Sequence, residues 1–120
     1  MATVVKRKLS GSTDGKPILV VATATIGTSI HTSIAGTTAG TFDEIWIYAY
    51  NGYTSNIVLT IEWGGATVPD QNIIVSIPYK AGLIPVIPGF ILQNGMVVTA
   101  FASVANQVTL NGFVNSITDA

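Results

Sequence analysis

The sequence predicts a single-domain, all-β protein: an antiparallel β-sandwich of jelly-roll or Greek-key type with about eight strands. Three observations support this fold class. Apolar and polar residues alternate with a period of two in several segments, as side chains do along a strand. Glycine, proline and asparagine interrupt these segments at spacings of roughly ten residues. No segment shows the period of 3.6 residues that an amphipathic helix requires.

The clearest alternation lies in Phe42–Trp63, where two strand-forming runs flank a polar turn, Asn51–Asn56. In the first run, aliphatic residues occupy one face and Trp46, Tyr48 and Tyr50 occupy the other. The second run alternates in the same way. Because the two runs are joined by residues that favour turns, we expect an antiparallel hairpin with one face in the core.

The other strands are expected on either side of this stretch, at residues 3–9, 18–25, 28–34, 72–79, 83–93, 96–103 and 108–114. Residues 96–103 and 108–114 should pair with each other as the two final strands, which we call the closing pair. Proline cannot donate a backbone hydrogen bond, so Pro78 should end its strand, and Pro85 and Pro88 should place theirs at a sheet edge. The chain, residues 1–120, is predicted to be one domain, with residues 1–11 as a candidate N-terminal arm.

The core should form from the more uniformly apolar face of each strand. We expect eight side chains to be largely buried: Ile45, Ile47, Leu59, Ile61, Val97, Phe101, Leu110 and Val114.

The composition favours assembly over an isolated monomer. Apolar residues make up 48% of the chain and charged residues only 9%, compared with about 25% charged in ordinary soluble domains. The net charge of −1 argues against a nucleic-acid partner, since phosphate neutralisation needs clustered cations. Cysteine is absent. We expect no signal peptide, because residues 1–12 lack a continuous apolar core, and no membrane-spanning helix, because proline, glycine and asparagine break the apolar run 81–114.

No set of residues indicates a catalytic, metal or cofactor site. The single histidine, His31, lies near Ser29, Ser33 and Asp43, but adjacent serines on a strand do not give an activated nucleophile. We therefore expect His31 to be structural or exposed, and its replacement by alanine to leave folding unchanged. The carboxylates of Asp43 and Glu44 should point to opposite faces. Glu62 and Asp70 lack coupled partners, so we expect the protein not to be an enzyme.

Two clusters remain as binding candidates. Trp46, Tyr48 and Tyr50, with Tyr53 in the turn, could bind sugar rings as an aromatic platform; alternatively they form half of the core or a seam between subunits. We favour the core or seam. The basic triplet Lys6–Lys8 is either a solvated strand edge that discourages aggregation or an anion-binding patch, and pairing with an acidic partner surface is a third alternative.

Several segments resemble a family of small virion proteins of tailed bacteriophages, encoded among head and tail structural genes. The likeness covers residues 12–118 and is carried by Ser12–Ile18, Asp43–Ala49, Leu59–Gly65, Pro88–Gly89, Leu92–Gly95, Val98–Asn106 and Gly112–Ile117.

The resemblance implies a β-sandwich that decorates or cements the capsid, commonly as a homotrimer bound to the major capsid protein. The protein would be made in the host cytoplasm and reside on the capsid surface of the virion. Lys6, Arg7 and Lys8 are then candidates for capsid contact. The alternative function is a tail- or fibre-associated module that binds a carbohydrate receptor, for which an exposed aromatic platform with polar neighbours would be diagnostic.

Overall fold

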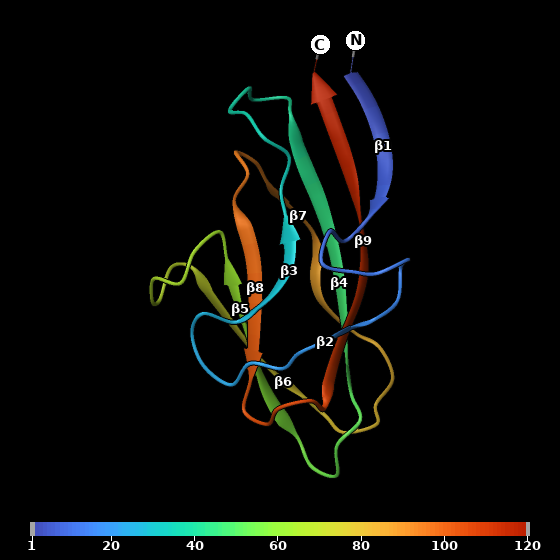
Figure 1. Cartoon of the computed structure of the whole chain (residues 1–120), viewed down its shortest axis with the longest axis vertical. Helices are drawn as coiled ribbons and strands as arrows, with labels where there is room; N and C mark the ends of the chain where they lie inside the picture. The colour runs from blue at the N-terminus through green and yellow to red at the C-terminus, as the bar shows by residue number, and fades with distance from the viewer. Residues whose placement is uncertain (1, 120) are drawn as a thin grey trace.

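The computed structural model describes residues 2–119, which form nine strands and no helix (Figure 1). Residues 1 and 120 of the predicted domain lie outside this range. The strands are β1 (Ala2–Lys8), β2 (Ile18–Leu19), β3 (Thr28–Thr32), β4 (Phe42–Asn51), β5 (Ile57–Trp63), β6 (Asn72–Ile77), β7 (Ile84–Leu92), β8 (Val97–Ala102) and β9 (Val108–Asp119). Within the described residues, no helix is long and apolar enough to cross a membrane.

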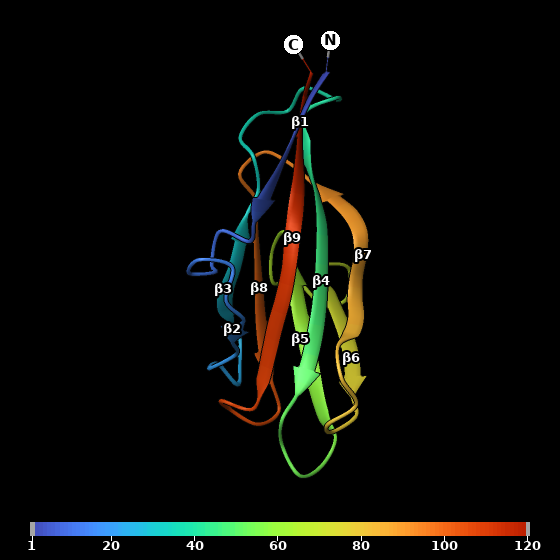
Figure 2. The ribbon, with the colours of Figure 1, turned by 90° about the vertical axis from the view of Figure 1, so that its right-hand side faces the viewer.

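The strands form two antiparallel sheets. Sheet A has the order β1-β9-β4-β7, with the short β2 also paired to β9, and sheet B has the order β3-β8-β5-β6. The two sheets pack as layers of an elongated molecule of 49 × 28 × 20 Å (Figure 2). The two termini lie together at one end (Figure 1), where β1 pairs with the last seven described residues of β9.

The strand order is that of a jelly roll. Four antiparallel pairs join strands that are progressively closer in sequence: β1 with β9, β3 with β8, β4 with β7, and β5 with β6. The chain is therefore one long hairpin, closed between β5 and β6 and folded so that successive pairs alternate between the sheets. This confirms the predicted β-sandwich in its jelly-roll form.

The hydrophobic core lies between the inward faces of the two sheets. In β4 every second residue is buried, so that Ile45, Ile47 and Ala49 face sheet B while the residues between them face outward. Leu59 and Ile61 on β5 are completely buried from the opposite layer. Burying the apolar face of both sheets in this way supplies the main favourable contribution to folding.

The prediction that Phe42–Trp63 forms an antiparallel hairpin is wrong, because its two strands do not pair with each other. β4 pairs with β9 and β7 in sheet A, whereas β5 pairs with β8 and β6 in sheet B. The turn crosses from one layer to the other, and the buried Asn51 holds it: its Nδ2 donates to Ser55 O and Ile77 O, both at 2.9 Å, and its Oδ1 accepts from Tyr53 N at 2.9 Å. The sequence was misleading here because two strands that face each other across a core show the same alternation of apolar and polar residues as the two strands of a hairpin.

The expected closing pair of residues 96–103 and 108–114 is wrong for the same reason. β8 belongs to sheet B and pairs with β3 and β5, and β9 belongs to sheet A. Strands that are consecutive in this region therefore alternate between layers instead of pairing.

Six of the eight expected core residues are buried, and the two on β8 are not. Val97 is 37% exposed and Phe101 is half-buried, while Val98, Ala100 and Ala102 face the core. The face with Phe101 also carries two hydroxyl groups that form hydrogen bonds outside the core. Thr99 Oγ1 donates to Glu62, and Ser103 Oγ, just after the strand, accepts from Val58 N. The smaller, wholly apolar face is therefore the inner one.

The proline predictions are confirmed. β6 ends at Ile77, immediately before Pro78. β7 contains Pro85 and Pro88 and is an edge strand of sheet A. Its register against β4 shifts twice, near Trp46 and near Tyr48, as expected where prolines leave gaps in the ladder.

Replacement of Leu59 by alanine should lower the free energy of unfolding by about 2–5 kcal/mol, because it leaves a cavity between the sheets. Val58, the adjacent residue on the outward face, is 45% exposed and gives a matched control: Val58→Ala should cost less than about 1 kcal/mol. Urea unfolding measures both values. Equal losses for the two variants would contradict the assigned faces of β5.

Candidate functional site

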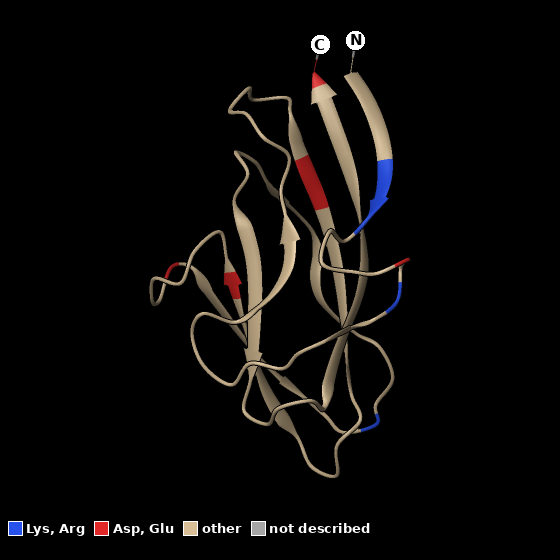
Figure 3. Cartoon of the chain, viewed as in Figure 1, with Lys and Arg blue, Asp and Glu red and all other residues tan. Residues whose placement is uncertain are grey.

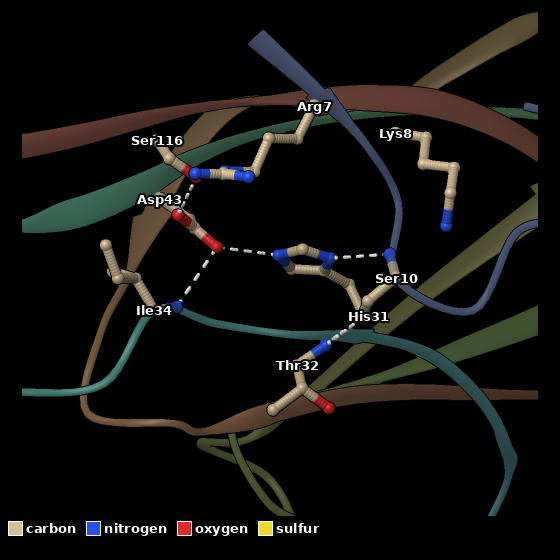
Figure 4. A pocket seen from close by; sticks show the side chains of 8 residues that line it. All are labelled: Arg7, Lys8, Ser10, His31, Thr32, Ile34, Asp43 and Ser116. Carbon is tan, nitrogen blue, oxygen red and sulfur yellow. Dashed lines mark hydrogen bonds and ion pairs between the residues drawn. The ribbon is translucent and has the colours of Figure 1, made fainter. Parts of the chain in front are cut away.

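A cavity of about 360 Å³ opens where β1, β3, β4 and β9 meet (Figure 4). Its lining consists of Arg7, Lys8, Ser10, His31, Thr32, Ile34, Asp43 and Ser116. It contains the only histidine of the chain and two of its cations, so it is the place where reactive chemistry would be expected.

The imidazole of His31 is fully used in hydrogen bonds. Its Nε2 lies 2.7 Å from Asp43 Oδ2, and its Nδ1 accepts the backbone N–H of Ser10 at 2.9 Å. Because Nδ1 is an acceptor, the neutral ring carries its proton on Nε2 and donates it to the carboxylate. Both side chains are buried, with relative exposures of 4% and 3%.

Asp43 accepts hydrogen bonds from two further donors. Ser116 Oγ donates to Oδ1 at 2.7 Å, and the backbone N–H of Ile34 donates to Oδ2 at 3.1 Å, beside the bond from His31. The carboxylate thereby ties β4 to β3, to the segment after it and to β9. A buried carboxylate with this many donors is stabilised in place.

This arrangement lacks the geometry of a catalytic triad. In a triad the histidine accepts a proton from the nucleophile while the acid holds its other nitrogen. Here a backbone amide occupies that nitrogen, and the hydroxyl of Ser116 bonds to the acid instead. Ser29 is exposed, and Ser33 Oγ is buried without a hydrogen-bond partner. His31 and Asp43 therefore act as a structural clamp, which we call the His31 clamp.

The sequence-based expectation that His31→Ala leaves folding unchanged conflicts with this geometry. We expect the substitution to lower the free energy of unfolding by about 2–4 kcal/mol, because Asp43 would stay buried after losing a donor. Thr32→Ala, at the exposed neighbouring position, should have an effect below about 0.5 kcal/mol. Thermal or urea unfolding distinguishes the two, and equal small effects would restore the original expectation.

Glu62 is a second buried carboxylate, which sequence reasoning left without partners. It is only 1% exposed. Its Oε1 accepts from Gly27 N and Thr99 Oγ1, both at 2.7 Å, and its Oε2 accepts from Thr25 Oγ1 at 2.9 Å. Burial raises the pKa of Glu62, but these hydrogen bonds outweigh that effect and hold the pKa below its ordinary value of 4.5. Glu62 thus fastens the segment before β3 onto sheet B.

The lowered pKa of Glu62 predicts a loss of stability in acid. The unfolded chain binds the proton more readily, so the free energy of unfolding should decrease as the pH falls below about 4.5 and through the folded-state pKa. Glu62→Gln should be less stable than wild type by about 1–3 kcal/mol at neutral pH, with a smaller difference in acid. Urea unfolding across this range measures it, with Asp70→Asn at an exposed position as control. A pH-independent difference would contradict the assignment.

The structure separates the three predicted capsid-contact cations. Arg7 and Lys8 line the cavity of the His31 clamp, where Arg7 extends over Asp43 and Ser116 (Figure 4). Lys8 Nζ donates to Ser12 O at 3.0 Å. Lys6 lies on the face of β1 opposite that of Arg7, with its Nζ 4.3 Å from the centroid of the Phe113 ring. All three are exposed and form the basic end of β1 in Figure 3.

Three of the four predicted aromatic residues lie outside the core. Trp46, Tyr48 and Tyr50 are half-buried on the outward face of β4, so the half-core interpretation is wrong. Phe113, which the sequence did not single out, lies opposite Trp46 on β9, and the two rings stack with centroids 6.0 Å apart. Trp46, Tyr48, Tyr50 and Phe113 are called the aromatic platform below. Tyr53 does not join it and packs against the core.

Two uncharged recesses lie at the β7–β8 turn and share Met96. One, of about 260 Å³, is lined by Ile26, Gly64, Gly65, Ala66, Gly95, Met96, Val97 and Thr99. The other, of about 340 Å³, is lined by Ala39, Phe42, Ile91, Leu92, Gln93, Asn94 and Met96. They are called the Met96 recesses below. Sequence reasoning missed them, because their lining comes from four separate segments of the chain, around residues 26, 39–42, 64–66 and 91–99.

Within residues 2–119, no three histidine, cysteine, aspartate or glutamate residues are placed to hold a metal ion. In comparisons with known proteins, the chain matches no family model, no curated protein and no solved structure.

Proposed function

We propose that the protein is a non-enzymatic structural protein of a bacteriophage virion. In this proposal it binds the outer surface of the capsid as a homotrimer and strengthens the shell, with the major capsid protein and its own copies as partners. The proposal combines the sequence resemblance to phage virion proteins with the surface properties of the fold.

The observation that carries the proposal is the amount of apolar side chain left on the surface. Among residues 2–119, fourteen large hydrophobic residues are exposed: Val4, Val5, Leu19, Val21, Ile26, Val58, Val68, Ile74, Tyr79, Leu83, Phe90, Ile91, Met96 and Val97. Few charges offset them, because two of the six acidic side chains, Asp43 and Glu62, are buried. Extended apolar surface of this kind favours contact with other protein chains.

Two groups of these exposed apolar residues lie on β1 and around the β7–β8 turn. β1 is exposed along its whole length, including Val4 at 62%, and one of its edges has no partner strand within the described residues. The Met96 recesses, with Ile26 at 75% and Ile91 at 55%, lie around the β7–β8 turn. Figure 1 places β1 and this turn on opposite sides of the same half of the molecule.

Two different surfaces on opposite sides are what a closed ring requires. In a ring each copy presents one surface to the preceding copy and the other surface to the next. A trimer in which the uncharged half of β1 approaches the Met96 recesses of its neighbour would cover both surfaces. A symmetric trimer also gains avidity when several copies bind one shell.

The hydrogen bonding of the acidic residues supports a non-enzymatic role. The His31 clamp and Glu62 direct their polar atoms to partners within the fold, and neither presents a free base beside a nucleophile. Jelly rolls also occur in viral capsid and lectin domains. That likeness is one of architecture alone and adds only a general expectation.

Met96→Asp should convert the trimer to a monomer without unfolding it, because Met96 is 41% exposed and a carboxylate there would be desolvated in the contact. Leu83→Asp, at an exposed position just before β7 at the other end of the sandwich, is the matched control and should remain trimeric. Light scattering with mass determination measures both. A monomeric wild type, or a trimeric Met96→Asp variant, would contradict the proposed contact.

Particles that lack the protein should rupture at a lower temperature than complete particles, and added protein should restore them. Arg7→Ala with Lys8→Ala should weaken rebinding, most strongly at low ionic strength, where exposed charge pairs are least screened. Lys6→Ala should have less effect, because Lys6 faces away from the cavity and lies over Phe113. Unchanged robustness combined with poor adsorption to cells would favour a receptor-binding role instead.

A further inference from the structure

The aromatic platform is a preformed surface that the assembly role does not use. Its rings lie on the outward faces of β4 and β9, the two central strands of sheet A. The same face carries amide and hydroxyl groups, since Tyr48 lies opposite Asn111 and Tyr50 lies opposite Thr109. From Glu44 to Tyr50 this face extends for about 20 Å along the strand.

Neighbouring groups hold Trp46 in place. Its Nε1 donates to Glu44 Oε1 at 2.8 Å, and its ring stacks on Phe113 with an angle of 14° between the planes. On the β7 side it covers Gly89, where an added Cβ would lie 2.7 Å from Cζ2 of the indole. Gly89 also has a φ of +84°, so glycine is required there for both reasons. A fixed ring loses little entropy when a ligand binds.

Glu44 provides a fixed acceptor beside the rings. Its Oε1 accepts from Trp46 and, at 3.1 Å, from Asn115 Nδ2. These two hydrogen bonds outweigh a small effect of burial and lower the pKa of Glu44, so the side chain is ionised at neutral pH. Oε2 makes no hydrogen bond to the described residues and is available to a donor such as a hydroxyl group.

We propose that the aromatic platform binds a neutral oligosaccharide along β4. A pyranose ring presents C–H groups on its face, which are attracted to the negative face of an aromatic ring, and hydroxyls around its rim. The platform offers both partners: the rings of Trp46, Tyr48 and Tyr50, since Phe113 is covered by Trp46 and by the Lys6 ammonium group, and beside them the Glu44 carboxylate and the amides of Asn111 and Asn115. This binding role goes beyond the proposed capsid function and does not rest on it.

Charge and shape favour a saccharide over other ligands. A nucleic acid could stack its bases on the rings, but among the described residues Lys6 alone places its ammonium group over one of them, and a phosphate backbone needs several such cations. An apolar protein segment would fit a recess lined by aliphatic groups, as at Met96, better than a face with amides and a carboxylate. Because the face is open along the strand, it suits an internal stretch of a sugar chain.

The test uses saturation-transfer NMR with three neutral hexasaccharides as probes: maltohexaose, cellohexaose and chitohexaose. Wild type should bind at least one of them, with transfer to the ring C–H protons. Trp46→Ala should weaken binding by about tenfold or more. Tyr79→Ala removes a ring that is 53% exposed outside the platform, and it should bind as wild type does.

Further variants and one measurement keep the test decisive. If Trp46→Ala does not fold, Tyr48→Ala and Tyr50→Ala replace it, and Glu44→Gln should weaken binding through loss of the carboxylate acceptor. Absence of binding to all three hexasaccharides would overturn the proposal. So would equal binding by wild type and all platform variants. A change in molar mass on replacing Trp46 would show instead that the rings form a contact between copies of the chain.

Discussion

The two faces of β4 differ in environment: one is buried in the core and the other lies at the surface. The rest of the structure depends on this separation. The inward aliphatic side chains of β4 join the core, while its outward rings remain at the surface. The separation follows from strand geometry, since successive side chains point to opposite sides. β4 can face both environments because it lies between β9 and β7, so that its backbone hydrogen bonds are satisfied on both edges.

Buried polar side chains connect the layers of this sandwich. Asp43 joins β4 to β3 and β9, Glu62 holds the segment before β3 against sheet B, and Asn51 sets the crossing between the sheets. Each is surrounded by donors or acceptors, so its burial does not leave an unpaired group. The use of two carboxylates inside the fold also leaves the surface poorer in charge than the composition alone indicates.

The two proposed roles occupy different surfaces. The apolar contacts proposed for assembly involve β1 and the β7–β8 turn, whereas the aromatic platform is centred on the outward faces of β4 and β9. A copy engaged with its neighbours in a ring could therefore keep the platform free. A capsid-bound protein that also binds saccharide would bring both functions to the outside of the particle, and each function can be tested independently of the other.

The sequence by itself determined the all-β class, the edge position of the proline-containing β7 and most of the core, because alternation and proline chemistry act locally. It did not determine which strands pair. The alternation of β4 and β5 is the same whether they form a hairpin or face each other across a core, so only the tertiary structure placed them in different sheets. Likewise, the partners of His31 and Glu62 lie 12 to 37 residues away, and Phe113 meets Trp46 only through the pairing of β9 with β4. Such contacts depend on register and layer order, which a single sequence does not reveal.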